Sequence, residues 1–251
     1  MQRLKVGLCG FTISAAAYPR RFPVLEVQQT FYQPPAPATM ARWRAGMPPG
    51  FEFTIKAWQL ITHTANSSTY RRLKRVLTEG ERLDAGAFQD SDIVQEGWAT
   101  TLACARALDA TAILFQCPAS FRPTDANVRN LRGFFARMRR PQNVRLLWEP
   151  RGPWPEDLLR TICADLDLVH VVDPFVTRTV TSGLTYYRLH GTTGARHVYS
   201  DAELQTLAAL VPASGETYVM FNNMPRVEDA RRFEALIAGS ALGASLVPPL
   251  G

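Results

Sequence analysis

The chain has 251 residues, an apolar fraction of 46% and a formal net charge of +6. This length suits one barrel-sized domain or two small ones, and the apolar content can fill a complete core. No apolar stretch reaches membrane-spanning length and no signal peptide is evident, so the sequence predicts a cytoplasmic protein without membrane contact. The moderate positive charge is compatible with an anionic substrate or with nucleic acid.

The four cysteines, Cys9, Cys104, Cys117 and Cys163, are far apart and form no CxxC pair. This spacing argues against a structural zinc site and against a disulfide framework. Buried free thiols in a reducing compartment are the expected state. Cys117 alone precedes a proline at the end of a predicted strand, which makes it the one cysteine to consider as reactive.

Eight short apolar segments have the length and the alternation of β-strands. Taken in chain order they are residues 4–9, 24–30, 51–57, 112–117, 144–149, 168–173, 185–190 and 217–222. Amphipathic helical patterns fall between most of them, over residues 37–43, 96–108, 124–138, 154–163 and 227–237.

Several of these helices have recognisable starts. Thr124 followed by Asp125 is a predicted N-cap, Pro155 occupies a first-turn position, and Ser200 with Glu203 forms a capping box. The connections 10–23 and 174–184 show no helical pattern. Residues 60–95 form a charged insertion with a helix of its own, and the proline-rich segment 240–251 is expected to be a loosely held tail.

The alternation of strand and helix along the whole chain predicts a parallel sheet. Eight such units at this length favour a closed TIM-type (β/α)8 barrel, in which the first and sixth connections are irregular and an insertion follows the third strand. The chain is then a single domain over residues 1–251. An open doubly wound sheet is the alternative, although the first strand lacks the GxGxxG turn of dinucleotide-binding proteins.

The strands share a phase that separates apolar from polar side chains. Alternate residues of a strand point to opposite faces, so the large apolar residues face the helices and the other set faces inward. The inward set is Glu26, Gln28, Thr54, Lys56, Gln116, Glu149, Asp173, Arg188, His190 and Asn222. Its charged members fall near the carboxyl ends of strands, where barrel enzymes carry their active sites. A buried ion network without any catalytic role is the alternative.

Eight strings of the sequence resemble the YecE-like family, the domain of unknown function 72. In chain order they are GLCGF, VQQTFYQPP, FEFTIKAWQLITH, ILFQCPASF, LLWEPRGPW, VVDPF, YYRLHG and YVMFNN. The forms WEPRG and VVDPF look like the archaeal or thermophile-type branch. The resemblance covers almost the whole chain and implies a TIM-type barrel, but it implies no particular reaction.

The resemblance also implies a set of signature positions. These are Thr30, Phe31, Tyr32, Lys56, Thr62, His63, Gln116, Pro118, Glu149, Arg151, Trp154, Asp173, Arg188, His190, Gly191, Asn222 and Asn223. They largely repeat the inward set. The chain departs from the family after the first strand, where it is shorter, and at Ala195 and His197, where a tyrosine-rich turn is expected.

Chemistry divides these positions into two groups. The catalytic candidates are Glu149, His190, Lys56 and Asp173, and the substrate-binding candidates are Tyr32, His63, Gln116, Arg151, Arg188, Asn222 and Asn223. Glu149 and His190 are the predicted acid–base pair, although Glu149 could instead be a salt-bridge partner of Arg151 or Lys56. The cations Lys56, Arg151 and Arg188 predict a phosphate- or carboxylate-bearing substrate, with hydrolysis or lysis as the reaction class.

Two further kinds of site are left open. Glu26, Glu149, Asp173 and His190 form a mixed set that suits a divalent metal, but the sequence has no HxH pair and the cations nearby can neutralise the carboxylates. The metal and any other cofactor therefore stay unassigned. A nucleic-acid-binding or nucleic-acid-processing role is the alternative function. It would use the basic residues of 71–82 with the aromatics Trp58, Tyr70 and Trp98.

Overall fold

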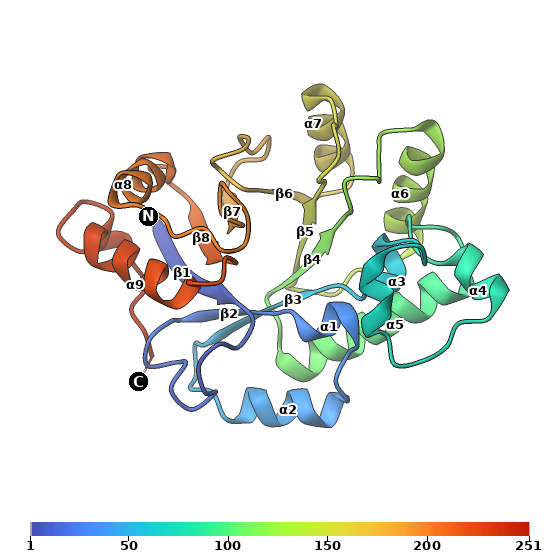
Figure 1. The fold of residues 1–251 in the computed structure, drawn as a ribbon, viewed down its shortest axis with the longest axis horizontal. Coiled ribbons are helices and arrows are strands. Elements are labelled where there is room, and N and C mark those ends of the chain that lie inside the picture. Colours follow the sequence, from blue (N-terminus) through green and yellow to red (C-terminus); the bar gives the residue numbers. More distant parts are fainter. Residues whose placement is uncertain (1, 251) are drawn as a thin grey trace. The chain divides into compact units, whose positions relative to one another are not determined.

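The computed structural model describes residues 2–250. Its eight strands follow one another around a closed barrel in sequence order, which confirms the TIM-type (β/α)8 fold. Figure 1 labels the strands and helices. The strands are β1 (Arg3–Cys9), β2 (Val24–Val27), β3 (Glu52–Lys56), β4 (Ala112–Gln116), β5 (Arg145–Glu149), β6 (Val169–Val172), β7 (Leu184–Leu189) and β8 (Glu216–Phe221). Seven strands begin and end within one residue of the sequence prediction.

The prediction for the second strand is wrong at its carboxyl end. The chain leaves β2 at Val27 and forms the short helix α1 (Gln29–Tyr32), so residues 28–30 are not extended. The Thr30 hydroxyl makes this turn possible, because it donates to the Val27 carbonyl at 3.0 Å and lies 2.6 Å from the Lys56 carbonyl. A threonine side chain that bonds to nearby carbonyls competes with the strand ladder for the backbone.

The helices between the strands are α2 (Pro37–Ala45), α3 (Gln59–Thr62), α4 (Glu79–Asp84), α5 (Asp92–Leu108), α6 (Asp125–Arg137), α7 (Glu156–Asp165), α8 (Asp201–Leu210) and α9 (Arg226–Ile237), with 3-10 turns η1 (Ser68–Arg72) and η2 (Gly243–Ser245). The predicted starts of α2, α6, α7 and α9 are correct to within two residues, whereas α5 begins at Asp92 and not at residue 96. Thr124 caps α6 by accepting from Asn127, and the Ser200–Glu203 capping box opens α8. The connections 10–23 and 174–183 contain turns and bends without helix.

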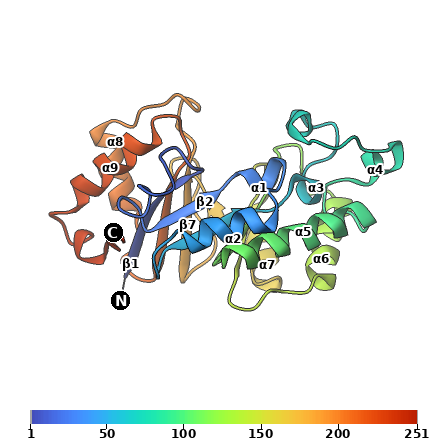
Figure 2. The ribbon, with the colours of Figure 1, turned by 90° about the horizontal axis from the view of Figure 1, so that it is seen from below.

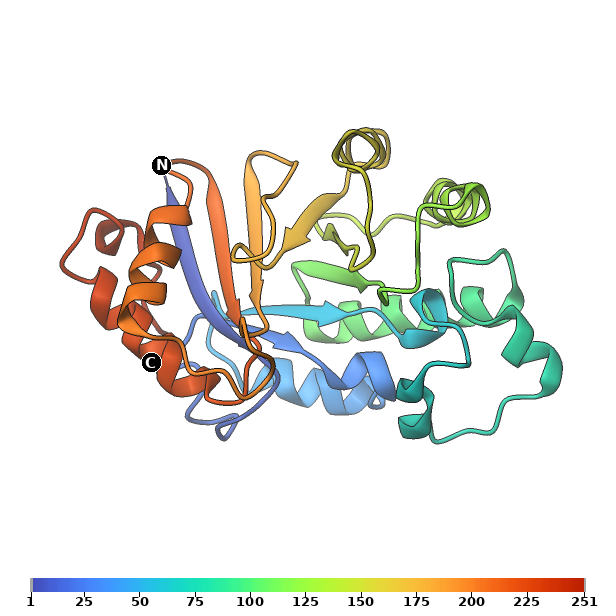
Figure 3. The ribbon, with the colours of Figure 1, turned by 45° about the horizontal axis from the view of Figure 1, so that its top comes forward.

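The described residues fall into two compact units. The first comprises residues 2–26, 45–52 and 169–250. In it β1 pairs in parallel with both β2 and β8, and β7 pairs with β6 and β8. Figure 3 shows β7 and β8 in orange beside the blue β1, and Figure 2 shows α8 next to α9. At the amino end of this sheet Lys5 is buried and bonds to Glu52, Glu216 and the Tyr218 hydroxyl.

The second unit comprises residues 27–44 and 53–168. Strands β3, β4 and β5 pair in parallel, and their register sets Lys56 beside Leu114 and Gln116 beside Glu149. The insertion after β3 carries α3, η1 and α4, which the sequence predicted only as one charged helix. Arg75 fastens it, because its guanidinium pairs with Glu81 and, at 2.8 Å, with Glu96 on α5.

The carboxyl-terminal segment, for which we expected loose attachment, is hydrogen-bonded to the first unit. The Val247 amide donates to the Leu4 carbonyl at 2.8 Å, and the Leu250 amide donates to Pro19 at 2.7 Å. Other amides of the segment, such as that of Leu246, bond within it, so the segment is ordered against the first unit. None of the helices formed by residues 2–250 is long and apolar enough to cross a membrane.

Candidate functional site

In the second unit, polar side chains end three neighbouring strands. Lys56 is the last residue of β3, Gln116 of β4 and Glu149 of β5. Because the strands are parallel and in register, these three residues lie at the same carboxyl edge of the sheet. Barrel enzymes place their chemistry at this edge.

Lys56 lies against an aromatic side chain. Its ammonium nitrogen is 3.4 Å from the centre of the Phe31 ring and 6.0 Å from that of Tyr32, and the residue is only 4% exposed. An ammonium over a ring face is stabilised by the electrons of the ring. The α1 turn that interrupts the second predicted strand therefore supplies the ring on which Lys56 rests.

His63 follows α3 and is held on two sides. Its Nδ1 lies 2.8 Å from the Thr62 hydroxyl, and its ring meets the Phe31 ring edge-on at 4.8 Å. Burial, and to a smaller extent the positive charge of Lys56, together lower the pKa of His63 to about 3. His63 is therefore neutral at physiological pH.

Glu149 and Arg151 form an ion pair with unequal exposure. The Arg151 Nε lies 3.4 Å from a Glu149 carboxylate oxygen, and the arginine side chain is 41% exposed while that of Glu149 is 6% exposed. This matches the structural alternative for Glu149, but it leaves part of the Arg151 side chain open to solvent. A carboxylate, two cations and a neutral imidazole thus belong to one unit.

The pKa of the Cys117 thiol is shifted by its burial and by nearby charged groups. Burial raises the pKa of its thiol to about 12; the nearby Glu149 carboxylate raises it too, while Lys56 and the indole N–H of Trp148, 3.3 Å from the sulfur, lower it. The thiol feels Lys56 and Glu149 together, which places both charges close to it. Because it stays protonated, Cys117 is not an activated nucleophile.

All four cysteines should resist modification in the folded protein. Each is buried as a free thiol, and burial raises the pKa of Cys104 to about 11 and that of Cys163 to about 12. We expect a thiol-specific chromogenic reagent at pH 8 to titrate none of them in minutes and all four after denaturation in urea. Rapid native modification of Cys117 would contradict its assignment as inert.

Other predicted residues of the second unit serve the local structure. The Arg72 guanidinium lies 3.5 Å from the centre of the Tyr32 ring. The backbone carbonyl of Tyr32 accepts a hydrogen bond from the Gln59 side chain at 2.8 Å. The indole N–H of Trp154 donates to the Phe121 carbonyl at 2.9 Å. Arg72 and Gln59 come from the insertion and were not among the predicted residues. The insertion therefore contributes directly to the surroundings of Tyr32.

In the first unit, the centre of the polar set is the ion pair of Glu26 and Arg188. Both side chains are buried, and the guanidinium donates Nη2 at 2.8 Å and Nε at 3.0 Å to the two carboxylate oxygens. The Tyr186 hydroxyl donates to the same carboxylate at 2.9 Å. Two donors of Arg188 are thus engaged within the protein, and its predicted contact with a substrate stays a prediction.

His190 lies next to this pair. Its Nε2 is 3.4 Å from Arg188 Nη1, and its Nδ1 is 3.0 Å from the side-chain amide of Asn222. Arginine only donates hydrogen bonds, and the Asn222 atom that faces Nδ1 is the side-chain nitrogen, which is also a donor. Arg188 and Asn222 together hold the orientation of the imidazole.

Asp173 and Asn223 organise the loops around His190. One Asp173 oxygen accepts from the His190 backbone amide at 3.0 Å, and the other accepts from Phe175 at 3.1 Å. Asn223 is buried and donates to the His197 carbonyl at 2.9 Å and to Asp229 at 2.6 Å. These contacts hold the loops that follow β6, β7 and β8, while the predicted chemical roles of both residues stay predictions.

Strand phase does not single out Tyr186 or Asp229, although Asp229 follows the YVMFNN string that resembles the family. Tyr186 has the same parity on β7 as Arg188, so the alternation itself places it on the inward face. Asp229 lies on α9, and no signal in the strands points to it. Among residues 2–250, no group of three or more His, Cys, Asp and Glu side chains is arranged to hold a metal ion.

Comparison with models of known protein families gives one match that covers most of the chain. The model of the family described as protein of unknown function DUF72 matches residues 14–248. The chain belongs to the DUF72 family. The resemblance seen in the sequence motifs is therefore confirmed over nearly the full length.

Solved structures support the same fold. A DUF72 protein from Enterococcus faecalis is 20% identical with a TM-score of 0.68, covering 95% of this chain and 98% of its own. One from Thermotoga maritima is 18% identical with a TM-score of 0.65, covering 94% and 99%. A fusion of a xylose isomerase-like TIM barrel with a 4-hydroxyphenylpyruvate dioxygenase is 10% identical, with a TM-score of 0.50 and coverages of 98% and 45%. Comparison with curated proteins gives no match.

Proposed function

We propose that this DUF72 protein is a cytoplasmic enzyme of the hydrolase or lyase class that acts on a small anionic substrate. The observation that carries the proposal is the set at the carboxyl edge of β3–β5, where Lys56 and Arg151 accompany the buried carboxylate of Glu149. Two cations against one carboxylate leave a positive charge that a phosphate or carboxylate group can complete. The four buried free thiols suit a reducing compartment.

The proposed roles follow from exposure and charge. Arg151 is partly exposed and presents its guanidinium to an arriving oxyanion, while Lys56 is fixed over Phe31 and adds a second positive charge. Glu149 is the acid–base group, because it is buried at the strand end and is paired with Arg151. Neutral His63 supplies a ring nitrogen for a hydrogen bond to substrate.

The nucleic-acid alternative receives less support from the side chains. Two of its three aromatics, Trp58 and Trp98, are 5% and 4% exposed, so they cannot stack on bases. The hydroxyl of the third, Tyr70, donates to the His63 carbonyl. Within the basic segment, Arg75 is engaged by Glu81 and Glu96 and Arg72 lies on Tyr32.

The test is the response of the melting temperature to inorganic phosphate. A ligand that binds only the folded protein raises the melting temperature through linkage. We expect millimolar phosphate to raise it for the wild type, less for Lys56→Met and Arg151→Gln, and more for Glu149→Gln, which removes a repelling charge. Lys74→Met, an exposed lysine on the basic insertion, is the matched control and should respond like the wild type.

The opposite signs expected for Glu149→Gln and the two cation variants make the test specific. If all five proteins respond equally to phosphate, or if only Lys74→Met loses the response, this edge of the sheet is not the anion site. A response to a divalent metal that disappears in Glu149→Gln would instead support the metal alternative.

A further inference from the structure

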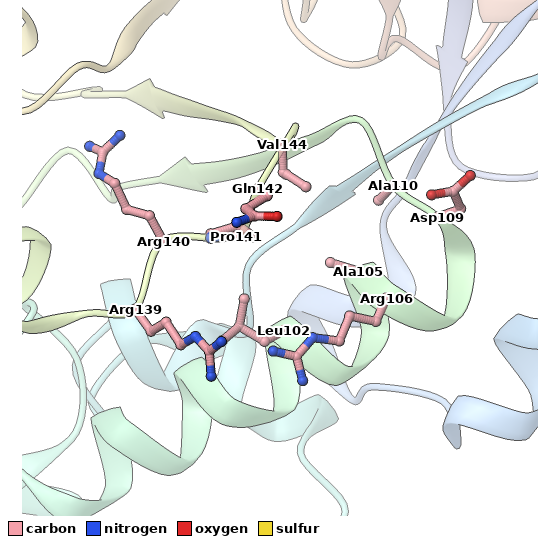
Figure 4. Close-up of a pocket in the computed structure, with 10 residues that line it drawn as sticks. All are labelled: Leu102, Ala105, Arg106, Asp109, Ala110, Arg139, Arg140, Pro141, Gln142 and Val144. Carbon is pink, nitrogen blue, oxygen red and sulfur yellow. The ribbon is translucent and has the colours of Figure 1, made fainter.

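A second candidate site lies at the other end of the same strands. A pocket of about 350 Å³ opens between the last turns of α5, the residues that lead into β4 and the loop 138–144 that leads into β5 (Figure 4). This volume is at the lower end of the range of small-molecule sites, ~300–1,000 Å³. The pocket is built entirely from the second unit, at the amino ends of β4 and β5, whereas Lys56 and Glu149 are at carboxyl ends.

One side of the pocket is apolar. Leu102 and Ala105 on α5, with Ala110 after it, are buried residues that line the pocket, and Pro141 and Val144 line it from the loop. Walls of this kind favour a ligand that has an apolar body, because its surface is removed from water on binding. A bare inorganic ion gains nothing from them.

The rim of the pocket carries arginines. Arg106 and Arg139 are exposed, and among the residues described, 2–250, neither guanidinium group has a hydrogen-bond or ion-pair partner. Their guanidinium groups point toward one another in Figure 4. The third arginine, Arg140, is engaged: it pairs with Asp167 at 3.1 Å and donates to the Leu166 carbonyl. This anchor fixes the loop from which Arg139 projects.

Local structure explains one of the two open arginines. Arg106 is in the last turn of α5, where the helix dipole favours a cation. Arg139 lies outside any helix, so no helix dipole stabilises its charge. Asp109 also lines the pocket; its left-handed backbone ends the helix, and in Figure 4 its carboxylate lies beside Ala110, away from the two guanidinium groups. The charge of the two open guanidinium groups can be matched by a ligand oxyanion.

We propose that this pocket binds a small phosphate ester with an apolar body. The phosphoryl group lies between the Arg106 and Arg139 guanidinium groups, and the apolar body packs on Leu102, Ala105 and Val144. The site is separate from the one under "Proposed function", with which it shares no residue. It gives the protein a second place at which an organic anion is recognised.

The experiment measures binding by titration calorimetry with phenyl phosphate, inorganic phosphate and phenol as probes. We expect phenyl phosphate to bind at least ten times more tightly than either of its halves, because only the ester uses the apolar wall and the arginines together. The double variant Arg106→Gln/Arg139→Gln should weaken phenyl phosphate at least tenfold. Arg129→Gln/Arg122→Gln, which removes two exposed arginines outside the pocket, is the charge-matched control and should bind like the wild type.

Three results would overturn the proposal. Equal affinity for phenyl phosphate and inorganic phosphate would mean that the apolar wall takes no part. Equal losses in the pocket variant and in the control would mean that only the net charge of the protein matters. A tenfold loss in Arg151→Gln with none in Arg106→Gln/Arg139→Gln would assign the binding to the carboxyl edge of β3–β5 instead. Circular dichroism of each variant confirms that these exposed substitutions leave the fold intact.

Discussion

Replacing Arg188 with methionine should destabilise the protein by about 3–5 kcal/mol, because the Glu26 carboxylate is then buried without its cation. Both residues are 0% exposed, and two of the bonds to this carboxylate come from Arg188. Methionine keeps much of the volume of the side chain, so the loss reports the charge and not a cavity. The measurement is the midpoint of urea unfolding, compared at equal slope.

Two further variants separate the ion pair from general damage to the core. Tyr186→Phe removes one neutral donor to the same carboxylate and should cost only ~1 kcal/mol. Adding Glu26→Gln to Arg188→Met removes the buried carboxylate that has lost its cation, and should recover part of the lost free energy of unfolding. If the single and double variants are equally unstable, packing and not the buried charge sets the stability at this position.

The fold could be predicted because the strand signal is local. Alternation along segments such as 51–57 and 185–190 gave strand positions to within one residue, and the regular return of helices implied a parallel barrel. The prediction failed at residues 28–30, which are all polar and where the Thr30 hydroxyl lies within hydrogen-bond distance of the Val27 and Lys56 carbonyls. Contacts with a residue far away in the sequence cannot be seen in a local pattern.

The strand phase predicted which side chains face inward but not which of them form pairs. Glu26, Lys56, Glu149 and Arg188 are all buried, as the phase implies. The sequence suggested Lys56 or Arg151 as partners of Glu149, and named no partner for Glu26. The Glu26–Arg188 pair joins residues 162 positions apart, and its geometry depends on the register of strands that alternation does not specify.

The rings near Lys56 show a second limit. Phe31 and Tyr32 could be read as core or as a lid, because an aromatic residue in a short apolar run has no directional signal. In the structure Phe31 contacts both Lys56 and His63, so one ring positions two candidate residues. Membership in the DUF72 family and the barrel fold do not add a reaction, since the same barrel supports many unrelated activities. The chemistry must be argued from these contacts.

Acid should destabilise the protein through His63. Burial and the charge of Lys56 lower the pKa of His63 from 6.5 to about 3 in the folded protein. Between these two pH values the unfolded chain therefore binds a proton at His63 that the folded protein does not bind. The stability that this group contributes is complete above pH 6.5 and is lost as the pH falls toward 3. At pH 4 the contribution of His63 to the free energy of unfolding is smaller than at pH 7.5 by ~3 kcal/mol. Free energies of unfolding in urea at pH 7.5, 6, 5 and 4 measure it.

The variant His63→Asn tests the origin of this acid sensitivity. Asparagine can keep a hydrogen bond to the Thr62 hydroxyl, now 2.8 Å from Nδ1, but it has no proton to take up in this pH range. Its unfolding free energy should therefore fall less steeply below pH 6.5 than that of the wild type. His197→Asn is the control. It removes a histidine on the loop after β7 that is paired with Glu203, and its free energy of unfolding should fall below pH 6.5 as steeply as that of the wild type. Parallel pH profiles for His63→Asn and the wild type would show that His63 takes up its proton in the folded protein, and that carboxylates alone set the acid limit.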